Sequence, residues 1–295
     1  MPHALTFSSA VDHLGDFAAA VNADYGIERS LKVAPQGLLG GRALITFHRS
    51  NLLAAGGWPA VATLLAQCGL ADQYHPPLAA AFEQAELIHF GLQDAPQLTA
   101  QEPWLKPNSG TKLVMKIYFE SATVDSSDRH WSLKEWRAAG IRPHYLAYKW
   151  HPHQAPVVTH YGSCPALAED VIADSLRLLA WDLTQQIHQL LDACERSLAT
   201  SEGQLLAVLE PATMRRSIDF NLYSAERTLG QVKPFLMAPL QSISPTNSAA
   251  LEQWLEANHS VQLGHLAWGC GRQNEPFLTC YYGVREVAAG VSFLD

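Results

Sequence analysis

Apolar and polar residues alternate along the stretch from Thr111 to Glu120. The mixed face carries Lys112, Val114, Lys116, Tyr118 and Glu120, and the apolar face carries Leu113, Met115, Ile117 and Phe119. A period of two is typical of a β-strand with unlike faces. On an open sheet the mixed face would meet water. In a shared interior, its two lysines and its tyrosine would instead be placed to bind an anion.

The same alternation recurs along the chain and predicts further strands. These are residues 26–33, 42–48, 86–93, 144–150, 157–161, 204–209, 217–223, 262–268 and 277–282. In the first of them, the interior face would carry either Glu28, Ser30 and Lys32 or the apolar set. Several of these strands have one apolar face and one face that is polar and aromatic.

Helical spacing of apolar residues predicts helices between the strands. They cover residues 9–23, 58–69, 76–86, 132–139, 165–198, 225–233 and 248–258. We expect Pro234 to end the helix that begins near Ala225, because proline cannot donate the backbone hydrogen bond. The longest segment, 165–198, carries an apolar stripe that would pack on a sheet.

The order of elements favours an α+β fold in which pairs of antiparallel strands alternate with helices. A doubly wound parallel sheet is disfavoured, because there is no tandem βαβ spacing and no glycine-rich turn from strand to helix. If the apolar strand faces meet the helices, the polar faces must line an interior. We therefore expect a closed antiparallel β-barrel with a polar and aromatic lumen, surrounded by α-helices, as a single domain over residues 1–295. An open sheet is the alternative.

Composition narrows the class of protein further. The net charge is -8 and no long basic block occurs, so nucleic acid is not an expected partner. The five cysteines are scattered and form no CxxC pair, which argues against a disulfide framework or a zinc ribbon. No signal peptide and no membrane span is apparent. We expect a soluble, cytoplasmic protein.

Basic and hydroxyl side chains recur on the mixed faces: Arg42, Lys112, Lys116, Tyr118, Tyr148, Tyr223 and Tyr281. Lys112 and Lys116 share one face about 13 Å apart, and two long side chains can converge on a diphosphate from that separation. Aromatic rings beside them would stabilise an allylic carbocation and exclude water. The alternatives are strand charges that face water and aromatic residues of an ordinary core.

A second candidate site is His151-Pro152-His153 with His160, which could ligate a metal ion as in a metal-dependent oxygenase. The alternative is an exposed loop. A third possibility is a barrel that binds a hydrophobic ligand without catalysis. The chain lacks a DDxxD cluster, a P-loop, a GxSxG motif and an HExxH motif.

Three segments resemble the ABBA-fold aromatic prenyltransferases. They are the strand Lys112–Tyr118, the strand that starts at Arg42 after Gly40-Gly41, and the closing Leu278–Tyr282. The spacing from Ile27 to Ile45, and from Leu133 to Val158, is most similar to that of the cyanobactin peptide prenyltransferases.

The resemblance implies a ten-stranded barrel that transfers a dimethylallyl or geranyl group from an allylic diphosphate to a peptide side chain. The peptide would be a macrocyclic cyanobactin-type natural product. Magnesium (Mg2+) would assist the diphosphate, without an organic cofactor. Glu28 would be the general base. The diphosphate-binding residues would be Arg42, Lys112, Lys116 and Tyr281.

The resemblance also suggests residues that bound the prenyl group and the acceptor: Tyr118, Tyr148, Ala207, Asp219, Asn221, Tyr223 and Trp268. The small side chain of Ala207 would leave room for a geranyl tail. Asp219 could hold a cationic acceptor or could be a surface residue. The modified side chain (Tyr, Trp, Ser, Thr, His or Arg) stays open.

Overall fold

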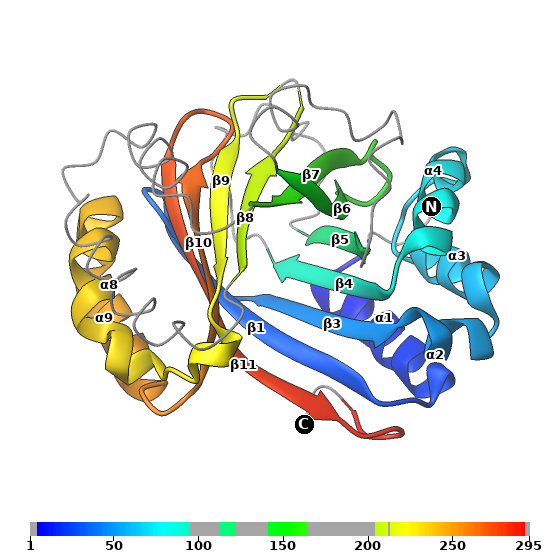
Figure 1. Ribbon diagram of the computed structural model, residues 1–295, viewed down its shortest axis with the longest axis horizontal. Coiled ribbons are helices and arrows are strands. Elements are labelled where there is room, and N and C mark those ends of the chain that lie inside the picture. Colours follow the sequence, from blue (N-terminus) through cyan, green and yellow to red (C-terminus); the bar gives the residue numbers. More distant parts are fainter. Residues whose placement is uncertain (1–4, 95–112, 122–140, 165–203, 212, 293–295) are drawn as a thin grey trace.

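The computed structural model describes residues 5–94, 113–121, 141–164, 204–211 and 213–292 (Figure 1). Three of the sequence predictions lie outside these ranges. They concern Lys112 and the helices expected over 132–139 and 165–198.

The described strands form one antiparallel sheet. They are β1 (Tyr25–Ala34), β2 (Gly37–Leu39), β3 (Arg42–His48), β4 (Leu87–Asp94), β5 (Leu113–Glu120), β6 (Arg142–Trp150), β7 (Val157–Ser163), β8 (Gln204–Leu209), β9 (Arg216–Asn221), β10 (Leu263–Cys270) and β11 (Pro276–Val287). Their order is β11-β10-β9-β8-β7-β6-β5-β4-β3-β1-β2. Successive strands along the chain are therefore neighbours in the sheet, except that β2 and β3 lie on either side of β1.

Pairing of β11 with β1 closes this sheet into a barrel. Ser30 lies opposite Tyr281 and Lys32 lies opposite Thr279 across the closing pair. The short β2 pairs with the end of β1 and adds to the rim. The closed barrel predicted from the alternating strands is thus confirmed, and the alternative of an open sheet is wrong.

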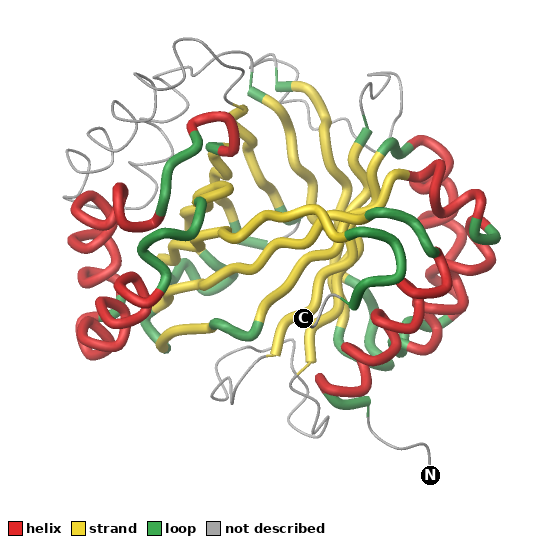
Figure 2. Tube along the Cα trace, turned by 90° about the horizontal axis from the view of Figure 1, so that it is seen from below, coloured by secondary structure: helices red, strands yellow, loops and turns green. Residues whose placement is uncertain are grey.

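Helices cover the outside of the barrel in two groups (Figures 1 and 2). The described helices are α1 (Phe7–Val21), α2 (Arg49–Ala54), α3 (Gly57–Gln67), α4 (His75–Gln84), α8 (Leu229–Ile243) and α9 (Ser248–Ala257). The first four cover β3 to β6, where Phe47, Phe90 and Ile117 are buried in one apolar cluster. The last two cover β8 to β11, where Phe220 and Leu266 belong to a second cluster.

Helix α8 continues through Pro234 and Pro239, so the expected end at Pro234 is wrong. Thr228 caps the helix, because its side chain accepts from the Gln231 backbone N–H and the Gln231 side chain accepts from the Thr228 backbone N–H. The apolar side of α8 is buried against the barrel. Packing of this face therefore outweighs the hydrogen bonds that the two prolines remove.

Among the described helices, none is long and apolar enough to cross a membrane.

Candidate active site

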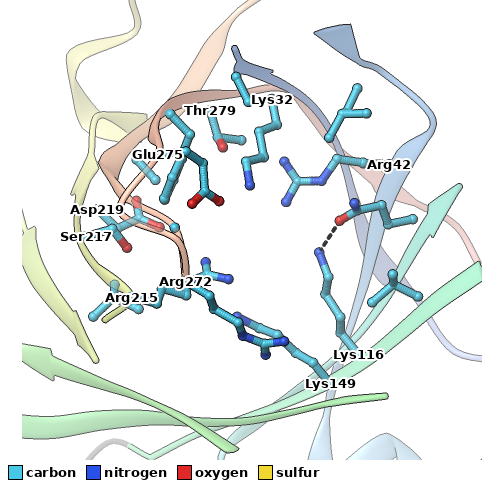
Figure 3. A pocket seen from close by; sticks show the side chains of 18 of the residues that line it. Lys32, Arg42, Lys116, Lys149, Arg215, Ser217, Asp219, Arg272, Glu275 and Thr279 are labelled. Carbon is cyan, nitrogen blue, oxygen red and sulfur yellow. Dashed lines mark hydrogen bonds between the residues drawn. The ribbon is translucent and has the colours of Figure 1, made fainter. Parts of the chain in front are cut away.

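Six basic side chains surround a cavity in the barrel (Figure 3). Lys32, Arg42, Lys116 and Lys149 come from β1, β3, β5 and β6. Arg215 precedes β9, and Arg272 lies in the turn between β10 and β11. Side chains alternate in direction along each strand. The apolar side chains therefore pack on the helices outside, and these basic side chains point into the lumen.

Lys116 and Arg42 lie at this cavity, as the sequence predicted. The Lys116 Nζ donates to Gln93 Oε1 at 3.0 Å. Burial, together with the nearby charges of Arg42 and Lys149, lowers the pKa of Lys116 well below its usual range. The Nε and Nη1 atoms of Arg42 and the Nε of Arg215 are buried, and no described residue is their hydrogen-bond partner. Three guanidinium nitrogens are therefore available to donate hydrogen bonds to an anion.

Sequence reasoning missed four of the basic residues as members of this cluster. Lys149 lies directly opposite Lys116 in the β5–β6 pair, so its position in the strand pattern could have identified it. Lys32 was identified only as a member of one of the two sets that could face the interior. Arg215 and Arg272 lie outside the strands, where no periodic pattern predicts which way a side chain points.

A buried carboxylate balances part of this charge. Glu210 has no exposed surface and forms an ion pair with Arg272, while the Thr159 hydroxyl donates to it at 3.3 Å. Burial by itself raises the pKa of Glu210. The Arg272 hydrogen bond and the charge of Arg215 outweigh that effect and bring the pKa to about 2. Glu210 is therefore an anion that holds Arg272 in place.

Tyrosines line the lumen beside the basic cluster. Tyr118 meets Tyr161 edge to face, with ring centroids 5.8 Å apart. Tyr281 lies near Arg42, whose guanidinium carbon is 5.8 Å from the ring centroid. Burial raises the pKa of Tyr281 to about 12, so its phenol is neutral. These rings give the cavity an aromatic wall that can face a cation.

Glu28 and Asp219 are joined by a histidine that the sequence analysis did not identify. The Nδ1 of His265 lies 2.5 Å from Asp219 Oδ1, and its Nε2 lies 3.2 Å from Glu28 Oε2. The Tyr223 hydroxyl donates to Glu28 Oε1 at 2.6 Å. His265 also stacks on Tyr281, with centroids 3.7 Å apart and an interplanar angle of 9°. Glu28, Asp219 and Tyr223 thus come together at one place in the lumen.

A second polar cluster is built around one carboxylate, that of Glu120, and draws its residues from β3 to β6. Glu120 Oε2 is 3.0 Å from His89 Nε2, and His89 Nδ1 is 2.8 Å from the Thr46 hydroxyl. His144 Nε2 lies 3.2 Å from Glu120 Oε1 without hydrogen-bond geometry. Glu120 is four residues beyond Lys116 on the same face of β5, about 13 Å away along the strand. The lumen is therefore basic in one part and rich in carboxylates and imidazoles in another.

Three residues expected in the lumen face outward instead. Tyr148 packs with Phe119 in the cluster under the first helix group, at a centroid distance of 6.3 Å. Trp268 belongs to the cluster under α8 and α9, and the partly buried Ala207 packs against that cluster. The side chain of an adjacent residue points to the opposite face of the same strand. Lys149, Val208 and Ala267, each adjacent to one of these three residues, therefore line the cavity. The room for a geranyl tail inferred from Ala207 therefore has no structural basis.

Asn221 shares the face of Asp219 on β9, but its side chain has a local partner. Its Oδ1 accepts from the Tyr223 backbone N–H at 3.1 Å. Tyr223 itself starts a short 3₁₀ turn rather than ending the strand, and this turn brings its hydroxyl to Glu28.

The histidines considered for a metal site do not converge. The Nδ1 of buried His151 lies 2.9 Å from the carbonyl of Leu113, whereas His153 is exposed with a φ of 65°. Within the described ranges, no three His, Cys, Asp or Glu side chains are grouped so that they could hold a metal ion. The described residues do not support the metal-oxygenase alternative.

The basic cavity also bears on the magnesium ion that the resemblance implies. Magnesium prefers carboxylate and phosphate oxygens. Glu275 and Asp219 line the cavity, but six cationic side chains surround the same space. These residues fit an anion and do not form a protein-held magnesium site, so we derive no step through a metal.

Comparison with solved structures shows that this barrel has the fold of known prenyltransferases. The 6-dimethylallyltryptophan synthase from Micromonospora olivasterospora, solved in complex with DMASPP and Trp, matches with a TM-score of 0.55 and 12% identity, over 95% of this chain and 97% of that one. NotF, solved in complex with brevianamide F and DMSPP, matches with a TM-score of 0.53 and 11% identity, over 90% and 81%. No family model and no curated protein matches the chain. The likeness establishes the ABBA prenyltransferase fold.

Proposed function

We propose that this protein is a prenyltransferase, an enzyme that transfers a prenyl group from an allylic diphosphate to an acceptor side chain. The observation that carries the proposal is the set of buried guanidinium N–H groups of Arg42 and Arg215 that have no partner among the described residues. They face a cavity with four further cations. Leaving such donors unpaired is costly, and a diphosphate would satisfy them with charge-assisted hydrogen bonds.

The donor diphosphate would bind among Arg42, Lys116 and the neighbouring cations. Arginine offers a planar fork and lysine a point charge, so the set suits a group with several oxygens. Negative charge grows on the diphosphate as the C–O bond ionises. Cations fixed in advance stabilise that change more than they stabilise the bound ground state. Lys112 stays a predicted member of this set.

The allylic cation would lie against the lumen tyrosines. The faces of Tyr118, Tyr161 and Tyr281 line the cavity and offer negative electrostatic potential, and an aromatic wall of this kind would limit the access of water that would quench the cation. The Tyr281 ring lies near Arg42, at the boundary between the diphosphate and the prenyl group.

The acceptor would enter beside Glu28, and Glu28 would take its proton after the new bond has formed. We further propose that the acceptor is a peptide, a macrocycle of the cyanobactin type. The donor would be dimethylallyl or geranyl diphosphate. This finer assignment is supported by the spacing of the strand segments around Glu28 and Arg42 in the sequence.

Mass spectrometry of acceptor mixtures tests the proposal. Linear and cyclic peptides that present Tyr, Trp, Ser, Thr, His or Arg, and free tryptophan as a non-peptide comparison, are incubated with each donor. We expect an acceptor to gain the mass of one dimethylallyl or geranyl group while diphosphate is released. Prenylation of free tryptophan alone would overturn the peptide assignment. Donor binding without diphosphate release under all conditions would favour the non-catalytic barrel.

A further inference from the structure

His265 occupies an unusual position between the two carboxylates of the acceptor side. It lies on β10, while Glu28 lies on β1 and Asp219 on β9. Both ring nitrogens face a carboxylate oxygen, at 2.5 Å and 3.2 Å. A neutral imidazole carries a proton on one nitrogen only, whereas an imidazolium donates from both. The geometry therefore fits the imidazolium form.

The stack on Tyr281 fixes the plane of this imidazole. The two rings are nearly parallel, at 9°, with centroids 3.7 Å apart. In that plane each nitrogen points at its own carboxylate. The arrangement depends on three different strands, because Tyr281, Asp219 and Glu28 belong to β11, β9 and β1.

We propose that His265 is a positioning residue for prenyl transfer, whose imidazolium holds Glu28 and Asp219 together as two ionised carboxylates. The inference rests on the proposed function, since it assigns a role within the same site. Together the three groups carry one net negative charge on the acceptor side of the lumen. The sequence did not indicate this role, because His265 is separated from its partners by long stretches of chain.

Without the histidine, two buried carboxylates would lose the cation that lies between them. Glu28 and Asp219 have exposed fractions of 4% and 5%. Burying two negative charges without a cation between them is costly, and uptake of a proton would relieve that cost but leave a carboxylic acid where the reaction needs a base. The imidazolium removes that conflict before the acceptor arrives.

The proton balance of the step is then defined. The C–O bond of the donor breaks and its electron pair leaves with the diphosphate. A bond forms between the allylic carbon and the acceptor atom, whose bond to hydrogen breaks, and the proton moves to the Glu28 carboxylate. The three groups change from one net negative charge to neutral, and His265 keeps both of its protons.

The groups that face His265 set its protonation. They are the carboxylates of Glu28 and Asp219 and the neutral phenols of Tyr281 and Tyr223. Burial alone would lower the pKa of His265. The charges of Asp219 and Glu28 outweigh burial and raise it well above the usual range. His265 is thus expected to stay protonated at the pH of the reaction.

Substitution of His265 tests the role through readouts that a structural effect would not produce. In His265→Ala, we expect the maximal rate to fall by about 10²-fold or more, within the range assigned to acid–base groups, with the KM for the donor changed less than about threefold. The acid limb of the pH–rate profile should move to higher pH, because the carboxylates lose their counter-ion. Added imidazole should restore part of the rate. The exposed His259→Ala serves as the matched control and should behave as wild type.

The results separate this inference from the proposed function. Absence of transfer by the wild type would overturn the proposed function. The role of His265 would be overturned if the wild type transfers the prenyl group and His265→Ala has an unchanged rate. It would also be overturned if the variant has a lower rate without a pH shift and without imidazole rescue.

¹⁵N NMR of histidine-labelled wild type provides a test that needs no turnover and no folded variant. We expect His265 to carry protons on both nitrogens at about pH 8, well above the ordinary pKa of histidine, and a neutral ring there would contradict the inference.

Discussion

Lys116 and Lys149 illustrate at the scale of single residues how the barrel prepares a site for an anion. They lie directly opposite each other on β5 and β6. Burial is the largest cause that lowers the pKa of both lysines well below the usual range, and the charges of neighbouring cations add to it. An anion in the cavity would reverse the effect of those neighbours. The cluster is therefore poorly satisfied alone and better satisfied with a ligand.

Lys116→Met tests the placement of the diphosphate. We expect the dissociation constant of the donor to rise about 10- to 100-fold, because a hydrogen bond to a charged group contributes about 1.5–3 kcal/mol. Titration calorimetry with the donor measures it. Lys233→Met is the control, since Lys233 pairs with Glu256 on the helical surface. Unchanged donor binding by Lys116→Met would place the diphosphate elsewhere.

Donor binding should also take up protons. The pKa values of Lys116 and Lys149 are low in the free protein, and the bound diphosphate raises them. Between the free and bound values, each lysine gains protons on binding, so affinity falls as the pH rises through that range. The enthalpy of binding should therefore depend on the ionisation enthalpy of the buffer. Equal enthalpies in all buffers, with an affinity that does not change from neutral to alkaline pH, would contradict this linkage.

At the scale of elements, the direction of each strand decides which side chains reach the lumen. The alternation in β5 correctly placed Lys116 and Tyr118 inside. In β6 the alternation predicted Tyr148 in the lumen, although the residue that lines the cavity is Lys149. A strand with large residues on both faces does not reveal which face packs on helices, since a tyrosine suits either environment. Turn residues such as Arg215 have no period at all.

Helix α8 offers a test of local stability. The cap at Thr228 closes the first turn of a helix that tolerates two internal prolines. We expect Thr228→Ala to lower the free energy of unfolding by about 1 kcal/mol, the usual effect of losing a side-chain cap. Denaturant titration measures it. Ser242→Ala, at an exposed position of the same helix, should change stability little, and an equal loss in both variants would argue against the cap.

At the scale of the whole molecule, the barrel brings together charges that are remote in the sequence. Glu28 and His265 come from opposite ends of the chain and meet because β11 pairs with β1. The closed barrel could be predicted from the sequence, since strands with one polar face recur along the chain and amphipathic helices are available to cover their apolar faces. It could not predict the link from Glu28 through His265 to Asp219, because such contacts depend on register and shear rather than on any local pattern.

Removal of metal tests the electrostatics of the complete lumen. Six basic side chains surround the cavity. We therefore expect the rate of transfer in EDTA to stay within about threefold of the rate with magnesium, because the protein itself supplies the charge that a divalent ion would provide. A loss of activity in EDTA that only magnesium restores would show that the diphosphate enters with its metal ion.

Calorimetric titration with dimethylallyl S-thiolodiphosphate, a slowly reacting donor analogue, measures directly whether the lumen binds an allylic diphosphate. We expect one binding site per chain, with binding that is strongly weakened in a variant carrying both Arg42→Gln and Arg215→Gln. That variant should keep the thermal stability of the wild type or exceed it, since it removes buried guanidinium nitrogens that have no hydrogen-bond partner among the described residues. Equal binding by the wild type and the double variant, or no binding by either, would contradict the claim that this lumen holds an allylic diphosphate.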